Sequence, residues 1–468
     1  MTLRFYNTLT RSVEDFTPLH EGEVRLYSCG PTVYNFVHIG NLRCYIFNDL
    51  LRRYLKYKGY RLIHVMNITD VDDKTIRDSR AEGTPLREFT DRYLAAFLDD
   101  LQTLNIEVPE QMPRATDEID GMVEMVQELL AKGNAYQTDS GDIYFAIDSF
   151  GDYGKLVNLD PQKLRENAAG RLSHADEYDK ESANDFALWK AWDEDDGEVF
   201  WETPLGKGRP GWHLECSVMS TKYLGQPFDI HTGGIDLAFP HHTNEIAQSE
   251  CACGKEFVRY WLHNEHLIVD GKKMSKSLGN FYTLRDLLAK GFHPLAIRYE
   301  LLKTHYRQRT DFREDHMAEN VKFLERIELL QESLRGASSP HDWPELPGVL
   351  QKAEKDFESS LDNDLNISGA LASLHELITT LNREAENLSA QDGLRAQKTL
   401  SRLDSVFGFF HYTSDHGDAE SDIQQLIDER QAARANKDFA RADAIRDELL
   451  ERGIELKDTP DGVKWKRT

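Results

Sequence analysis

The sequence predicts an α/β protein with a split, doubly wound parallel sheet, an α-helical bundle and a small mixed α/β C-terminal domain. Two strand, helix, strand patterns, in residues 24–68 and 228–271, predict the split sheet. A change to almost continuous helical periodicity beyond about residue 315 predicts the bundle. Because strands joined by a crossover helix pack in parallel, each pattern supplies one half of the sheet.

The first half of the sheet consists of two short apolar segments around an amphipathic one. Residues 24–28 (VRLYS) and 62–68 (LIHVMNI) are apolar and β-branched or aromatic, which is typical of buried strands. The segment from Asn41 to Lys58 has helical spacing, and Gly59 stands where a helix ends. These residues therefore form a strand, helix, strand unit.

The second half repeats the pattern after a long interval. Strands are expected at 228–234 (FDIHTGG) and 265–271 (EHLIVDG), with a helix that begins at Pro240 and ends at Gly254. The interval contains Glu-rich helices, a strand in SGDIYFAI and the acidic stretch WDEDDGEVFW. We interpret the interval as an inserted segment, with the acidic stretch as a solvated loop.

Beyond the sheet, the chain becomes helical and then breaks at HYTSDHGDAESD, which separates a small last unit with a strand-like tail, VKWKR. The expected domains are the first half of the catalytic domain (1–114), the inserted segment (115–205), the second half (206–270), a loop and connecting region (271–314), the bundle (315–412) and the last domain (420–468).

Composition is that of a soluble globular protein, with 40% hydrophobic and 29% charged residues among 468. No apolar run of about 18 residues and no leader pattern occurs, so we expect no membrane segment and a cytoplasmic protein. Five cysteines form no regular framework, which favours thiols or metal ligands over disulfides.

The net charge of −25 alone argues against nucleic-acid binding. Basic residues nevertheless gather in two short islands, at 298–313 and 464–467. This distribution suits a partner that is held at two places.

Two short motifs suggest phosphate chemistry. His38-Ile39-Gly40-Asn41 lies at a strand-to-helix turn, where free N–H groups and a histidine can bind phosphoryl oxygens. Alone, the motif also fits an ordinary capping turn. In GKKMSKSLGN (271–280), Lys273 and Lys276 lie in a loop that can close on phosphates. Each motif follows a strand of its own half of the sheet, at the edge where such sheets bind ligands.

Together, HIGN and KMSKS resemble the two signature motifs of class I aminoacyl-tRNA synthetases, whose catalytic domain is Rossmann-like. Asn41 stands where the usual motif has a second histidine, so its role is limited to hydrogen bonding. The resemblance implies catalytic roles for His38, Asn41, Lys273 and Lys276, and ATP contacts from Gly30, Thr32, His38, Gly40, Asn41 and Lys276.

Four residues suggest a zinc site. His241 and Glu245 are four residues apart and share a helix face, Cys29 lies on the turn before His38, and Cys216 precedes the second half of the sheet. Singly, each fits a core thiol or a surface hydrogen bond. Because both halves of the sheet meet at the strand ends, the four residues together favour zinc.

CGPTVY, NITDVDDK, GRPGWHLECS, FPHHTNEIAQSE and KMSKSLGNF together resemble the cysteinyl-tRNA synthetase family over essentially the whole chain. The resemblance implies activation of L-cysteine by ATP with Mg²⁺ and transfer to the 3′ end of the cysteine tRNA. It also implies one Zn²⁺ per chain on Cys29, Cys216, His241 and Glu245. That ion would bind the substrate thiolate, so no editing domain is expected. We expect a monomer.

Further residues follow with the resemblance. Thr69, Trp212 and Asp236 are placed near the substrate cysteine, although the first two also fit ordinary core positions. His231 and His242 would orient the metal ligands. Cys44 is interpreted as packing, while Cys251 and Cys253 could form another ligand set, for which their spacing is poor.

The last unit resembles the family's anticodon-binding domain. Unstacked bases are recognised by stacking and by edge hydrogen bonds, and the residues expected to do so are Arg434, Phe439, Asp443, Arg446 and Asp458. A charged, solvent-facing helix pair is the alternative.

Two other functions remain open at this point. A similar enzyme class activates cysteine and joins it to an amino sugar, but should lack the last domain. A tRNA-binding or metal-binding relative without catalysis is the second, although His38, Lys273 and Lys276 are all present.

Overall fold

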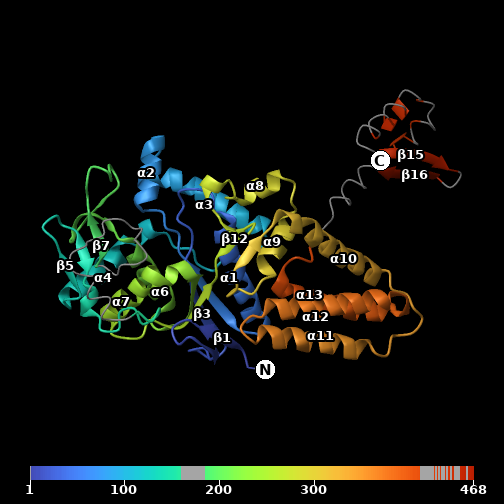
Figure 1. The fold of residues 1–468 in the computed structure, drawn as a ribbon, viewed down its shortest axis with the longest axis horizontal. Helices are drawn as coiled ribbons and strands as arrows, with labels where there is room; N and C mark the ends of the chain where they lie inside the picture. The colour runs from blue at the N-terminus through green and yellow to red at the C-terminus, as the bar shows by residue number, and fades with distance from the viewer. Residues whose placement is uncertain are drawn as a thin grey trace. The chain divides into compact units, whose positions relative to one another are not determined.

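The computed structural model describes residues 2–159, residues 185–411 and parts of 426–467, including two strands near the C-terminus (Figure 1). The chain divides into two compact units, Met1–Phe410 and His411–Thr468.

A four-stranded parallel sheet forms the centre of the first unit. Its order is β11-β10-β3-β4, with β3 at Glu23–Ser28, β4 at Arg61–Met66, β10 at Phe228–Gly234 and β11 at Val258–Asn264. The two halves of the sheet meet between β3 and β10, where Ile230 lies opposite Leu26. The chain leaves this central pair in opposite directions, which defines a topological switch point. The predicted doubly wound parallel sheet is confirmed.

One predicted strand does not belong to this sheet. The segment 265–271 contributes β12 (Leu267–Val269), which pairs with β13 (Lys272–Lys273) and β14 (Thr310–Phe312) in a separate small sheet. The true neighbour of β10 is β11, whose sequence VRYWLHN is buried almost throughout. Two apolar segments follow one another here, and tertiary pairing decides which joins the sheet.

Helices cover both faces of the sheet. Helix α1 (Ile39–Tyr57) follows β3, and most of its residues are buried, including the charged side chains of Arg43, Asp49 and Arg52. The helix predicted between Pro240 and Gly254 is a single π-helical turn, η4 (Ala238–His242), followed by α7 (Thr243–Cys253). Helix α6 (Trp212–Leu224) precedes β10.

The region between the two halves has its own sheet. Helices α2 (Asp73–Glu82), α3 (Leu86–Thr103) and α4 (Ile119–Ala131) lead into an antiparallel sheet of order β5-β6-β7-β9-β8. These strands are Ala135–Gln137, Ile143–Phe145, Phe186–Ala191, Gly206–Pro210 and Trp201–Thr203, respectively. In the acidic loop before β8, Asp196 is buried and pairs with Arg209 at 2.8 Å. That carboxylate is structural, contrary to our reading of the whole stretch as solvated.

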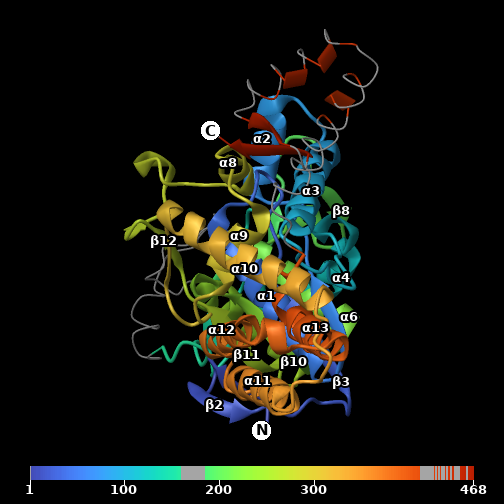
Figure 2. The ribbon, with the colours of Figure 1, turned by 90° about the vertical axis from the view of Figure 1, so that its right-hand side faces the viewer.

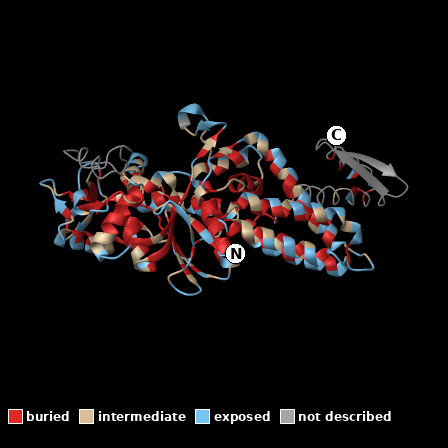
Figure 3. Cartoon of the chain, turned by 60° about the horizontal axis from the view of Figure 1, so that its bottom comes forward, coloured by how far each residue is buried: buried red, intermediate tan, exposed pale blue. Residues whose placement is uncertain are grey.

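Helices α8 (Leu284–Ala289) and α9 (Pro294–Leu302) lead into the bundle of α10 (Met317–Arg335), α11 (Leu346–Leu361), α12 (Ile367–Arg383) and α13 (Ala390–Phe407). Figure 2 views α11, α12 and α13 nearly along their axes, and buried and exposed residues alternate around them in Figure 3. At the N-terminus, β1 (Arg4–Asn7) and β2 (Ser12–Asp15) form an antiparallel hairpin.

The second unit contains the hairpin of β15 (Ile454–Thr459) and β16 (Gly462–Arg467), in which Trp465 lies opposite Leu456. Across the described parts of both units, no helix has the length and apolar character needed to cross a membrane.

Candidate active site

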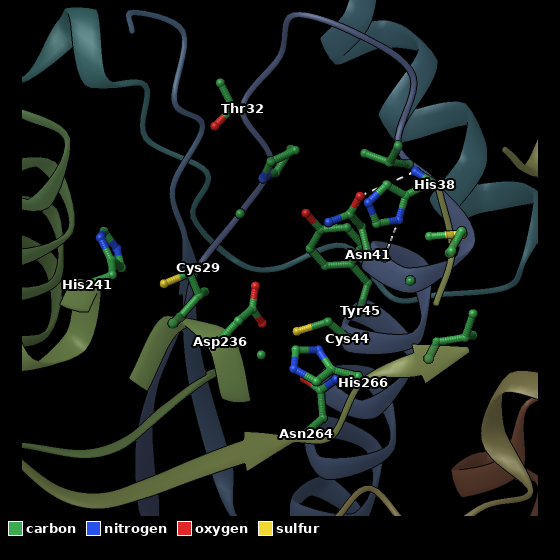
Figure 4. A pocket seen from close by; sticks show the side chains of 18 of the residues that line it. Cys29, Thr32, His38, Asn41, Cys44, Tyr45, Asp236, His241, Asn264 and His266 are labelled. Atoms are coloured by element: carbon green, nitrogen blue, oxygen red, sulfur yellow. Dashed lines mark hydrogen bonds between the residues drawn. The ribbon is translucent and has the colours of Figure 1, made fainter. Parts of the chain in front are cut away.

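A cavity of about 850 Å³ lies at the carboxyl ends of the central strands, where β3 and β10 diverge. Cys29 follows β3 directly, and Gly234 ends β10. In Figure 4, Cys29 and His241 lie at one end of this cavity, His38 and Asn41 lie toward the other, and Asp236 lies between them. The volume is large enough for an amino acid together with a nucleotide.

His38 caps helix α1, toward the end of the cavity opposite Cys29 and His241. Its Nδ1 accepts a hydrogen bond from the Asn41 backbone N–H at 3.2 Å, and its own N–H donates to Asn41 Oδ1 at 3.3 Å. A neutral imidazole that accepts at Nδ1 carries its proton on Nε2, so Nε2 is the atom that can donate. Burial lowers the pKa of His38, which favours this neutral form.

The asparagine of HIGN therefore has a defined role in the turn. Its amide oxygen completes a capping box at the start of α1, and this fixes the backbone of His38. Gly40 is required beside it, since a Cβ there would lie 3.0 Å from the His38 ring and 3.3 Å from Met274 Cε. A Cβ on Gly30 would lie 1.7 Å from the carbonyl oxygen of Asn67.

The loop with KMSKS reaches the same cavity. Lys273, on β13, is exposed and lines the cavity. Asn280 holds the loop closed on itself, because its side chain accepts from Ser275 N–H at 2.8 Å and donates to the Lys273 carbonyl at 3.2 Å. Lys276 begins the short turn η5 (Lys276–Leu278), and its side chain lies outside the described part of the structure.

Backbone contacts join the two motifs directly. The N–H of Ile39 donates to the carbonyl of Tyr282 at 2.9 Å, and His38 forms a β-bridge with Thr283. The HIGN turn and the segment after KMSKS are therefore one structural unit.

The four expected metal ligands come together at the end of the cavity away from His38. Donor atoms of Cys29, Cys216, His241 and Glu245 all lie within 4.8 Å of one another. Cys216, His241 and Glu245 are buried, whereas Cys29 is half-buried and lines the cavity. Glu245 Oε1 lies 3.0 Å from His241 Nε2 without forming a well-directed hydrogen bond. Two thiols, one imidazole and one carboxylate fit tetrahedral zinc.

Charges at these donors also suit a cation. Burial alone would raise the pKa of Cys216, but the hydrogen bond from Cys29 and the proximity of His241 bring it to about 6. Burial would likewise raise the pKa of Glu245, but His231 and His241 bring it down to about 2. Both side chains are therefore anionic at neutral pH in the absence of metal.

The residues expected near the substrate cysteine lie around the donors. Trp212 stacks on His241 with ring centroids 4.2 Å apart, and both line the cavity with Asp236 and Thr69. The Thr69 hydroxyl donates to Glu215 Oε2 at 2.8 Å, and Thr32 bridges to Thr69 through the backbone.

Several cavity residues were not predicted: Asn264, Glu265, His266 and Arg309 also line it. Asn264 ends β11, the strand that we did not predict, and Glu265 and His266 follow it, so recognition of that strand would have placed all three at the ligand-binding edge. Cys44, interpreted as packing, is half-buried on α1 and lines the cavity as well.

The basic island at 298–313 is only partly internal, so part of it remains available as the nucleic-acid surface that we expected. Arg298 is fully buried and pairs with Asp49 at 2.5 Å. Arg307 pairs with Asp364, and Arg313 pairs with Asp315. Arg307, Arg309 and Arg313 are all exposed.

Of the expected anticodon residues, Arg434, Phe439 and Asp443 lie outside the described residues. Arg446 is exposed. Asp458 lies in β15, opposite Val463.

Three family models match the chain. Residues 15–322 match a class I tRNA synthetase (C) catalytic domain, residues 356–411 match a DALR domain, and residues 416–465 match a cysteinyl-tRNA ligase anticodon-binding domain. With a parallel sheet whose switch point brings HIGN and KMSKS together, these matches define a class I aminoacyl-tRNA synthetase.

Similar sequences narrow the class further. The chain is 48% identical to a cysteine–tRNA ligase of Brachyspira hyodysenteriae, with 99% of each chain covered, and 46% identical to one of Chlamydia muridarum, with 100% of each covered. The chain belongs to the cysteine–tRNA ligase family. Its activity is accordingly the ATP-dependent attachment of cysteine to tRNA. The chain is therefore neither an amino-sugar ligase nor a non-catalytic relative.

Solved structures agree on the fold. A methionyl-tRNA synthetase of Mycobacterium tuberculosis, bound to methionyl-adenylate, superposes with a TM-score of 0.60 at 16% identity and covers 83% of this chain and 90% of its own. A LeuRS of Agrobacterium radiobacter gives 0.59 at 14% identity, with 86% of each chain covered.

Proposed function

We propose that this cysteine–tRNA ligase selects its amino acid by its thiol, through a zinc ion held by Cys29, Cys216, His241 and Glu245. The observation that carries this proposal is the position of the four donors, at one end of the cavity that His38 reaches from the other and that Lys273 also lines. Thiol and carboxylate of a single cysteine are close together, so a thiol-binding site must adjoin the activation site.

When bound, zinc supplies a Lewis acid that prefers thiolate to hydroxyl. Serine offers a much poorer ligand, and alanine offers none. Sites that require one specific polar contact reject analogues without it by roughly 10⁴ to 10⁵, so no editing step is needed. The Trp212 indole, stacked on His241, forms a wall beside the substrate, and Asp236 receives its ammonium group.

On the nucleotide side, the chain stabilises charge and positions groups. The Nε2–H of His38 donates to the α-phosphate as the cysteine carboxylate attacks it, because Nδ1 is already engaged by Asn41. Lys273 and Lys276 bind the departing pyrophosphate. Gly30, Thr32 and Gly40 admit ATP, which enters with Mg²⁺, close to the backbone.

The second step is transfer to the cysteine tRNA, with the C-terminal unit on the anticodon. Arg434, Phe439, Asp443, Arg446 and Asp458 are the proposed contacts, and a monomer carries out both steps.

Cysteine-dependent exchange of pyrophosphate into ATP tests the proposal, with serine as competitor and zinc content measured in parallel. We expect one zinc per chain, exchange with cysteine only, and loss of both exchange and zinc upon chelation. Exchange that proceeds equally with serine, or that survives complete metal removal, would contradict the role of zinc.

A further inference from the structure

We infer that a second set of metal donors overlaps the proposed zinc site. This inner set consists of Cys29, Glu245, His231 and His242. Their donor atoms all lie within 4.8 Å of one another, as do those of the outer set, Cys29, Cys216, His241 and Glu245. The two sets share a thiol and a carboxylate and differ in the other two donors. The inference rests on the proposed function in one respect, namely that a metal binds the shared pair.

The spacing of the inner donors is that of metal ligands. His242 Nε2 lies 3.3 Å from Cys29 Sγ and 4.0 Å from Glu245 Oε1, and His231 Nε2 lies 2.9 Å from Glu245 Oε2. Tetrahedral zinc with bonds of about 2.0 to 2.3 Å places its ligand atoms roughly 3.3 to 3.8 Å apart. These three distances differ from that range by no more than a few tenths of an ångström, and all four donor atoms lie within 4.8 Å of one another.

The ring of His231 already points its Nε2 at the shared carboxylate. That nitrogen lies 2.9 Å from Glu245 Oε2, while Nδ1 on the other side of the ring lies 3.3 Å from the carbonyl oxygen of Thr232. A metal ion on the inner set would replace the hydrogen bond between Nε2 and Glu245 without turning the ring.

His242 is held as metal-bound histidines are held. Its Nδ1 lies 2.8 Å from His263 Nε2, and His263 Nδ1 lies 2.8 Å from the Thr8 hydroxyl. Metal-binding histidines use their second nitrogen in this way. Gly233 makes room for the ring, since a Cβ there would lie 2.6 Å from His242 Cε1.

The two sets differ in their access to substrate. Cys216 and His241 line the cavity, whereas His231 and His242 are fully buried and are not among its lining residues. Because the two sets share Cys29 and Glu245, we expect the chain to hold one ion, on one set or the other. An ion on the inner set is therefore retained by the protein but withdrawn from the cysteine pocket. Such a position would keep zinc in a chain whose Cys216 thiol has been lost.

Cobalt(II) binding to the full-length chain tests this inference, because thiolate ligands give cobalt a strong near-ultraviolet absorption. Wild type should bind one cobalt through two thiolates. C216S should still bind one cobalt, with about half the thiolate absorption per cobalt, since one thiolate remains. In C216S/H242A, the affinity for cobalt should fall about 10- to 100-fold below that of C216S.

Three controls accompany these variants. H242A alone should retain one cobalt with the absorption of two thiolates, because the outer set is intact. C216S/C44A should match C216S, which excludes Cys44 as the source of the remaining thiolate. Circular dichroism checks that each variant folds. If the buried serine hydroxyl prevents C216S from folding, C216A replaces it.

Each remaining outcome is decisive. If wild type binds cobalt through two thiolates and C216S binds none, the inner set is contradicted while the proposed function stands. Equal affinity of C216S and C216S/H242A also contradicts it, since three outer donors would then suffice. Wild type that binds no metal contradicts the proposed function itself, and the inner set with it.

Discussion

The ring of Phe281 lies edge-on against the imidazole of His38, with 5.1 Å between the two centroids. Phe281 directly follows Asn280, the residue that holds the KMSKS loop closed on itself. It therefore connects the position of that loop to the position of His38, for which we propose a contact with ATP.

Phe281→Ala should lower kcat of cysteine-dependent pyrophosphate exchange about 10- to 100-fold, because small misplacements of a reacting group cost this much. KM for cysteine should change little, since the metal end of the cavity is untouched. Tyr282→Phe, which keeps the ring and loses only the hydroxyl, serves as the matched control. Equal rates for Phe281→Ala and the control would show that Phe281 does not position His38.

Asn41 is predicted to act through the capping box rather than as a charged group. Asn41→Ala removes the acceptor for the His38 N–H and should destabilise the chain by about 1 kcal/mol while slowing exchange. Asn41→Asp keeps an acceptor at a helix N-terminus, so its stability should equal or exceed that of wild type.

The aspartate variant should nevertheless react more slowly than the alanine variant, because its negative charge lies beside the ATP phosphates. Thermal unfolding and exchange rates, measured on the same preparations, separate the two effects. An aspartate variant that is both stable and fully active would contradict the assigned contact with ATP.

His64 should make stability depend on pH. Burial, with a smaller contribution from Arg52, lowers the pKa of His64 to about 3, and its ring hydrogen-bonds to Ser28 Oγ at 2.8 Å. The unfolded chain takes up a proton near pH 6.5, whereas the folded chain does not. The contribution of His64 to the free energy of unfolding is therefore fully present above pH 6.5. It is lost as the pH falls toward 3, by at most about 1.4 kcal/mol per pH unit.

Comparison of His64→Gln with wild type between pH 7.5 and 5.5 measures this dependence. Glutamine does not titrate, so the unfolding free energy of the variant should fall less steeply than that of wild type. Parallel curves for the two chains would assign the acid sensitivity to other groups.

Arg298 is predicted to hold the bundle against the sheet domain. Its guanidinium donates to Asp49 on α1, to the carbonyl of Phe407 at the end of α13 and to those of Leu104 and Asn105. Arg298→Met removes one of the two arginines that pair with the buried Asp49 carboxylate, the other being Arg53, and should cost about 1 to 3 kcal/mol.

Asp49→Asn in the same chain should restore part of that loss, because no buried carboxylate then remains. Chemical denaturation of the single and double variants measures the difference. A double variant less stable than Arg298→Met would contradict the explanation.

Much of the fold could be predicted because its elements have local signals. The segment before Cys29, the helix after His38 and the bundle each have a clear period, and the structure has them within a few residues of the predicted bounds. Strand β11 could not be placed, since two apolar segments follow one another and only the partner strand distinguishes them. Because β11 was not predicted, Asn264 and His266 were not recognised as cavity residues.

The candidate site could be predicted from the sequence for a different reason. Cys29, His38, His241 and Lys273 stand in short motifs with their own chemistry, so each could be named before its position in space was known. The buried pairing of Arg298 could not be named in this way. An arginine near other basic residues resembles a surface island, and only the surrounding carbonyls and Asp49 reveal it as part of the core.

The switch point between β3 and β10 also determines when the site can form during synthesis. Cys29 and Glu245 are 216 residues apart, and β10 must emerge before it can pair with β3. At translation rates of about 5 to 20 residues per second, roughly 10 to 40 s pass between the appearance of the first donor and the last. For that period, the nascent chain exposes a thiol with an incomplete ligand set. Capture of the proposed zinc ion would thus be a late event, and the first half of the sheet must remain unaggregated on the ribosome until its partner arrives.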